Sequence, residues 1–147
     1  MVDLYAVTVP AEDQQNDSLY LCPVTIGGQQ LMLDFDSGSS DLWVMSTHLD
    51  PTTQTALKAS KHKIYDPAKS KTMAPALGQI WNIQYGDGSE ASGDVVTDDL
   101  QIGSITVKNQ AIGCARVLSD AFAKTEGDGL LGLAMGTMSS FIQQINV

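Results

Sequence analysis

Short segments rich in β-branched, aromatic and aliphatic residues, separated by turn residues, recur along most of this chain and constrain its fold more than any other feature. Residues 19–26 and 31–35 flank Gly27-Gly28, a pair typical of a two-residue β-hairpin turn. Further strands are expected over residues 4–9, 42–45, 80–85, 92–100 and 106–114, and residues 130–135 form another apolar run. The series predicts an all-β domain built from many short strands.

Residues 46–79 interrupt this pattern, with three prolines and five lysines among them. We expect loops here, with one short helix near residues 53–60. A second short helix is expected over residues 119–124. A third is expected over residues 139–147, where a serine is placed to cap it.

Length, charge and cysteine content limit the classes of protein that fit. A chain of 147 residues is the size of one ordinary domain. Its net charge of −9 disfavours nucleic acid as a partner, and no apolar run approaches the roughly 20 residues that span a bilayer. Cys22 and Cys114 would either pair or remain buried thiols, and no cysteine spacing typical of a metal site is present.

The candidate catalytic carboxylate is Asp36, which ends an apolar strand and begins the run Asp36-Ser37-Gly38-Ser39. The glycine permits close approach of the backbone. Hydroxyl and amide donors beside Asp36 would stabilise its anion and fix its orientation. An ordinary strand-to-turn corner uses the same residue types, so this run alone leaves a purely structural role open.

Two further segments narrow the choice when they are read together with the first. The segment Tyr85-Gly86-Asp87-Gly88-Ser89 has the composition of a mobile hairpin tip beside a large aromatic ring, which can cover a bound chain and exclude water. The segment 128–134 combines apolar residues with glycines, a pattern that fits close backbone packing and also fits an ordinary core strand.

In order and approximate spacing, the three segments resemble those of pepsin-like aspartic proteases, and most closely the fungal secreted aspartic endopeptidases. The resemblance extends from about Leu4 to Phe141. It implies an all-β acid-protease lobe with bent, partly barrel-like antiparallel sheets, a flap hairpin and one or two short helices. Residues 1–147 would form a single amino-terminal lobe. Ser37 stands where the family usually has threonine and keeps the hydroxyl group.

The resemblance also implies a role for each candidate site residue. Asp36 would be one of two aspartates that activate a water molecule for attack on a peptide bond, without a metal or other cofactor. The supporting residues of the catalytic loop would be Ser37, Gly38, Ser39 and Trp43. The flap and substrate-binding residues would be Tyr85, Gly86, Asp87, Gly88, Ser89, Phe122 and Leu130. Asp34 lies two residues before Asp36 on the same strand, so both side chains point to the same face. Asp34 is therefore not the expected second aspartate, because two such neighbours cannot face one water molecule from opposite sides.

One member of the catalytic pair remains unassigned, because the family enzymes have two lobes and each lobe supplies one aspartate. The sequence contains Asp36-Ser37-Gly38 once, with no second copy. A homodimer mate, as in the retroviral relatives, or a separate carboxy-terminal lobe would supply the other. An exposed apolar face on a single lobe would favour such association. The expected function is endopeptidase activity at acidic pH once the second aspartate is supplied. The alternatives are a non-catalytic peptide- or inhibitor-binding lobe and an inactive fragment.

The expected partners are a polypeptide substrate or a pepstatin-like inhibitor. The many carboxylates and few basic residues suit a protein that works in acid, because low pH protonates exposed carboxylates and relieves their repulsion. A secreted or vacuolar location is therefore expected. The triplet Asn16-Asp17-Ser18 fits the glycosylation pattern of secreted proteins. The first residues, Met1-Val2-Asp3, lack the basic and apolar features of a signal peptide.

Overall fold

The structure, a computed structural model, describes residues 2–4, 7–9, 12–14, 19–36, 41–85 and 88–132 of the chain. Most of these residues lie in strands, which confirms the all-β prediction. The strands are β1 Val2–Leu4, β2 Val7–Val9, β3 Glu12–Gln14, β4 Leu19–Ile26, β5 Gln29–Asp36, β6 Leu42–Val44, β7 Ala74–Gln84, β8 Glu90–Ile102, β9 Ile105–Leu118 and β10 Gly129–Gly132. The helices are α1 Pro51–Ala59 and the 3-10 turns η1 Pro67–Lys69 and η2 Asp120–Lys124.

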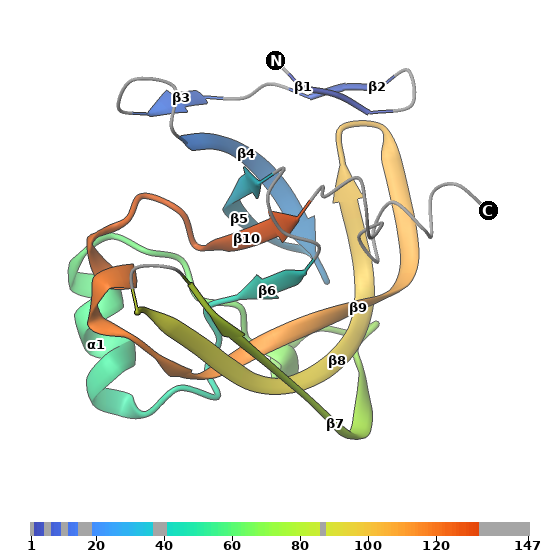
Figure 1. The fold of residues 1–147 in the computed structure, drawn as a ribbon. Helices are drawn as coiled ribbons and strands as arrows, with labels where there is room; N and C mark the ends of the chain where they lie inside the picture. Colours follow the sequence, from blue (N-terminus) through green and yellow to red (C-terminus); the bar gives the residue numbers. More distant parts are fainter. Residues whose placement is uncertain are drawn as a thin grey trace.

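Eight of the strands form one sheet in the order β3-β4-β5-β10-β6-β9-β8-β7. An additional pairing between β4 and β8 closes the inner strands, β4 through β8, into a barrel, which β3 and β7 extend. The β5–β10 and β6–β9 pairs are parallel and the other pairs are antiparallel. In Figure 1, β10 lies between β5 and β6, and the long strands β8 and β9 curve around the lower part of the molecule.

The hairpin between β4 and β5 forms where the sequence predicts it. Gly27 and Gly28 both have positive φ, +54° and +81°, which are values that glycine adopts without steric cost. A Cβ atom at Gly27 would lie 2.3 Å from a carboxylate oxygen of Asp98, so this turn also requires a glycine for space. The turn sets the register that pairs Cys22 with Leu33 across the two strands.

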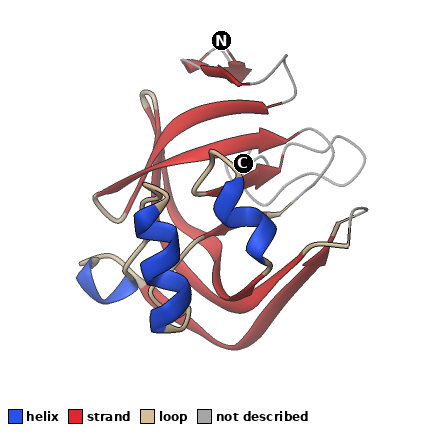
Figure 2. Ribbon diagram, turned by 90° about the vertical axis from the view of Figure 1, so that its left-hand side faces the viewer, coloured by secondary structure: helices blue, strands red, loops and turns tan. Residues whose placement is uncertain are grey.

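A short helix was expected near residues 53–60, and α1 forms there. It starts at a well-formed N-cap. Asp50 accepts a hydrogen bond from Thr53 N at 3.1 Å, and Pro51 occupies the first turn. Figure 2 shows the helices gathered on one side of the strands. Within the described ranges, no helix is long and apolar enough to cross a bilayer.

The interior of the barrel is filled by aliphatic side chains from β4, β5, β8 and β9. Among them lie Cys22 and Cys114, which are both free and fully buried. Burial raises the pKa of the Cys22 thiol to about 11 and that of Cys114 to about 12. The sequence left a disulfide and two buried thiols as alternatives, and the structure has the thiols.

The structure corrects three of the expected elements. Residues 4–9 do not form one strand, because β1 and β2 pair antiparallel with Val2 opposite Val9. Residues 74–79 are part of β7 rather than irregular, and a register shift between Pro75 and Ile80, with Gly78 at φ +80°, hides the strand pattern. The short strand β3 was not expected. Residues 133–135 and the expected helix 139–147 lie outside the described residues.

Candidate active site

Asp36 is the last residue of β5 and lies beside β10. The two strands run parallel, with Gly132 opposite Asp36. The amide of Gly132 donates to the carbonyl of Asp41 at 2.8 Å. Gly132 is therefore paired with the residue before the segment 37–40 and hydrogen-bonded to the residue after it. The segment contains the predicted support residues Ser37, Gly38 and Ser39 and lies outside the described residues.

The burial of β5 side chains alternates along the strand. Leu31, Leu33 and Phe35 are buried, whereas Asp34 and Asp36 on the opposite face are half-buried. The two carboxylates therefore share one face of the strand, as the two-residue spacing predicts.

A close approach of backbones lets β10 fit between β5 and β6. A Cβ atom at Gly129 would lie 2.3 Å from the carbonyl oxygen of Trp43 and 2.9 Å from Cα of Val44. No side chain fits there without moving the main chain of β6. The segment 128–134 was expected to pack closely against neighbouring backbone. The structure shows at Gly129 that such packing requires a glycine.

Four aromatic rings pack together next to this strand. The indole Nε1 of Trp43 donates to the hydroxyl of Tyr85 at 3.0 Å. Phe122 meets Trp43 edge-on at 5.3 Å between ring centroids and meets Tyr85 at 5.6 Å. Trp81 stacks on Trp43 at 5.6 Å with an interplanar angle of 19°. Trp81 was not among the predicted site residues, although it alternates with Ile83 and Tyr85 on one strand face, and this alternation is the signal that could have identified it.

A cavity of about 60 Å³ lies at this cluster. It brings the predicted residues Trp43, Phe122 and Leu130 together with Asp34, and Thr125, Gly127 and Gly129 complete its lining. The lining is mostly apolar, which suits an uncharged side chain.

The Tyr85 phenol lies within electrostatic reach of Asp36. Burial raises the pKa of Tyr85, the hydrogen bond from Trp43 opposes this, and the negative charges of Asp36, Asp41 and Asp34 raise it further. The phenol therefore remains protonated at acidic and neutral pH. Tyr85 N donates to Ser89 O at 2.8 Å and Gly88 N donates to Tyr85 O at 3.0 Å, which forms the turn between β7 and β8. Gly86 and Asp87 lie outside the described residues.

Comparison with known proteins decides the family. The sequence model described as eukaryotic aspartyl protease matches residues 19–146. The chain belongs to the eukaryotic aspartyl protease family.

Fungal proteins are among its relatives, in agreement with the resemblance seen in the sequence. The chain is 46% identical over 136 residues to Aspergillopepsin-1 of Aspergillus fumigatus, covering 92% of this chain and 32% of that protein. It is 46% identical over 126 residues to Penicillopepsin-1 of Penicillium janthinellum, covering 85% and 37%. It is 45% identical over 126 residues to a probable aspartic-type endopeptidase of Arthroderma benhamiae, covering 85% and 28%. The chain thus spans about a third of the length of these aspartyl proteases.

A buried His–Asp pair lies directly before β10 of this aspartyl protease chain. His62 Nδ1 lies 3.1 Å from Asp128 Oδ1, and His62 Nε2 lies 3.2 Å from the carbonyl oxygen of Ala123. The hydrogen bond to Asp128 raises the pKa of His62, burial opposes this, and the Ala123 carbonyl raises it again. No sequence pattern indicated a role for His62, because its partner is 66 residues away.

The part of the chain that the structure describes contains no group of three or more His, Cys, Asp or Glu side chains that could hold a metal ion. The polar side chains described at the candidate site include the carboxylates of Asp34 and Asp36, the phenol of Tyr85, the indole of Trp43 and the hydroxyl of Thr125. Such groups can position and polarise a water molecule or a peptide carbonyl.

Proposed function

We propose that this chain is the amino-terminal lobe of an aspartic endopeptidase and that Asp36 is one of its two catalytic carboxylates. It hydrolyses peptide bonds at acidic pH once a second aspartate comes from a homodimer mate or from a carboxy-terminal lobe. One observation carries the proposal. The phenol of Tyr85 accepts a hydrogen bond from Trp43 next to a mostly apolar cavity, which is lined by Asp34 from the face of β5 that also carries Asp36.

In the proposed reaction, one carboxylate of the pair takes a proton from a water molecule as the water attacks the scissile carbonyl. The other carboxyl group donates a proton to the carbonyl oxygen. Two carboxyl groups that share one proton suit this task, because close like charges keep one group protonated in acid. Ser37, Gly38 and Ser39 would orient Asp36 in this step.

The β7–β8 hairpin would cover the bound polypeptide. Tyr85 would close over the substrate, and Gly86, Asp87, Gly88 and Ser89 would contact its main chain. Phe122 and Leu130 would form the walls of a pocket for an apolar substrate side chain. A mostly apolar lining supports this role, because burial of an apolar group is favourable by about 25 cal/mol per Å². A pepstatin-like inhibitor would occupy the same surface.

We propose a secreted or vacuolar location for the protein. The net charge of −9 supports this, since an acidic compartment protonates exposed carboxylates and lowers their mutual repulsion.

The test is cleavage of an unfolded protein at acidic pH, with and without a pepstatin-type inhibitor. The chain would be assayed alone over a range of concentrations and again after addition of the carboxy-terminal lobe of a fungal relative. A rate that rises with the square of the concentration supports a homodimer, and activity that requires the added lobe supports a two-chain enzyme. Inhibitor binding without hydrolysis under any condition would overturn the proposal and leave a non-catalytic binding lobe.

A further inference from the structure

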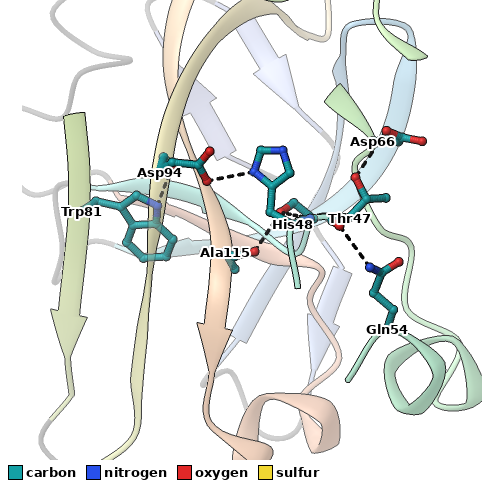
Figure 3. Close-up of polar contacts among 8 residues, drawn as sticks. Thr47, His48, Gln54, Asp66, Trp81, Asp94 and Ala115 are labelled. Carbon is teal, nitrogen blue, oxygen red and sulfur yellow. Dashed lines mark hydrogen bonds and ion pairs between the residues drawn. The ribbon is translucent and has the colours of Figure 1, made fainter. Parts of the chain in front are cut away.

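A second His–Asp pair joins the loop before α1 to strand β8. His48 Nδ1 lies 2.8 Å from Asp94 Oδ1, with side chains 31% and 33% exposed (Figure 3). We propose that His48 is a positioning residue, which fixes Trp81 through Asp94 and thereby fixes Tyr85 at the base of the β7–β8 hairpin. That Tyr85 contacts substrate rests on the proposed function, whereas the positioning itself does not.

The loop that carries His48 is held from several sides, so the imidazole is presented from a fixed support. The amide of His48 donates to Ser46 Oγ at 3.2 Å, and this buried hydroxyl donates to Ala115 O of β9 at 2.8 Å. Gln54 of α1 donates to the carbonyls of Thr47 and Leu49 at 3.0 and 2.7 Å. The dashed lines in Figure 3 mark the contacts around Thr47, Gln54 and Ala115.

Asp94 lies next to an irregularity in the pairing of β8. The pairing of β8 with β9 shifts register between Ser92 and Gly93, directly before Asp94. A Cβ atom at Gly93 would lie 1.8 Å from the carbonyl oxygen of Cys114, so this position requires glycine. Glycine restricts the backbone least of all residues. Asp94 is paired with Cys114 of β9 and Ile80 of β7, and the contact from His48 adds a side-chain restraint to these pairings next to the bulge.

The restraint continues from Asp94 to the hairpin. The main-chain oxygen of Asp94 accepts a hydrogen bond from Trp81 Nε1 at 3.0 Å. The ring of Trp81 lies against Gly113, where a Cβ atom would be 2.7 Å from it, and stacks on Trp43. Trp43 in turn donates to the hydroxyl of Tyr85. Each contact fixes the ring that makes the next one, so His48 acts on Tyr85 without touching it.

Hydrogen exchange of the indole N–H groups, measured by NMR at mildly acidic pH, tests this directly. Replacing His48 by alanine should make exchange at Trp81 about two- to five-fold faster, because a half-exposed pair contributes modestly. Trp43 should show a smaller increase. His48→Asn should restore slow exchange, because the asparagine amide offers a donor near the position of Nδ1. Lys108→Ala is the matched control, since it breaks another surface pair, Lys108–Asp99 at 3.4 Å, and should change neither indole.

Unchanged exchange at Trp81 in a folded His48→Ala protein would overturn the inference. So would equal acceleration in the alanine and asparagine variants, or acceleration of every core amide in parallel. If His48→Ala does not fold, Asp94→Ala gives the same test, because it removes the carboxylate and keeps the carbonyl that Trp81 contacts. With a second lobe supplied, His48→Ala should raise KM by a similar factor and leave kcat nearly unchanged. Absence of hydrolysis in the unaltered protein would refute the proposed function, while the exchange measurement would still decide this one.

Discussion

The protein contains two His–Asp pairs with similar contact distances and opposite surroundings. His62 and Asp128 have side chains only 2% and 6% exposed, whereas those of His48 and Asp94 are about one-third exposed. Asp128 of the buried pair directly precedes β10, and Asp94 of the exposed pair is a residue of β8. Burial removes competing water and screening ions, so the same contact has a larger effect on folding inside than at the surface.

The partners of each pair extend this difference. Besides His62, Asp128 accepts hydrogen bonds from Met32 N at 2.9 Å and Lys63 N at 3.1 Å. Both ring nitrogens of His62 face oxygen atoms, so the imidazolium, with two N–H donors, satisfies both contacts. The buried pair therefore joins β5, β10 and the segment after α1, and we expect its loss to affect the whole fold. The side chains of the exposed pair are joined to each other by a single contact, and we expect its loss to have a local effect.

The largest effect is predicted for Asp128→Ala. This change leaves a buried histidine and two amides without their acceptor, and should lower the free energy of unfolding by about 3–5 kcal/mol. Urea unfolding followed by fluorescence measures it, with Asp94→Ala as the matched control. If both variants lose the same amount, burial does not separate the two pairs.

The next prediction concerns pH. The pKa of folded His62 is raised above the ordinary value of about 6.5, so its contribution is fully present below that value and is lost as pH rises through the raised pKa. Between the two values the slope is at most about 1.4 kcal/mol per pH unit. His62→Gln should remove this part of the pH dependence of unfolding. The same pH dependence in the variant and the unaltered protein would contradict it.

A smaller effect is predicted for His48→Ala on stability. A half-exposed pair contributes about 0.2–1 kcal/mol, so the unfolding midpoint should barely move. A loss of more than about 2 kcal/mol would show that the pair is part of a larger network, because it exceeds what such pairs supply.

The smallest predicted effect is that of salt. About 1 M sodium chloride shortens the screening length to roughly 3 Å and should remove most of the contribution of the exposed pair. The stability difference between the unaltered protein and His48→Ala should therefore shrink in salt. The difference for Asp128→Ala should persist, and equal salt dependence in both would contradict the comparison.

The sequence predicted local features well and distant contacts poorly. Strand β4, its glycine turn and the helix near residues 53–60 depend on residues adjacent in the chain, and each was found. The β1–β2 reversal and the first half of β7 were missed, because strand-forming residues do not reveal where a chain turns back or bulges.

For the candidate site, resemblance predicted Trp43, Tyr85, Phe122 and Leu130, and these residues lie around one aromatic cluster and cavity. Trp81, His48 and His62 were missed as supporting residues. Their partners lie 13 to 66 residues away, and only the pairing of strands brings them together. The functional roles of all the predicted site residues remain predictions, and Ser37, Gly38, Ser39, Gly86 and Asp87 also lie outside the described residues.

Asp36 is the residue on which the proposed hydrolysis depends most, and its neighbour Asp34 offers a control on the same face of β5. The decisive measurement is kcat/KM for peptide cleavage after a second lobe is supplied, for Asp36→Asn and Asp34→Asn side by side. We predict that Asp36→Asn lowers kcat/KM by roughly a thousand-fold or more, since it removes a group that transfers a proton, and that Asp34→Asn retains most of it. Comparable activity in Asp36→Asn and the unaltered protein would contradict the account.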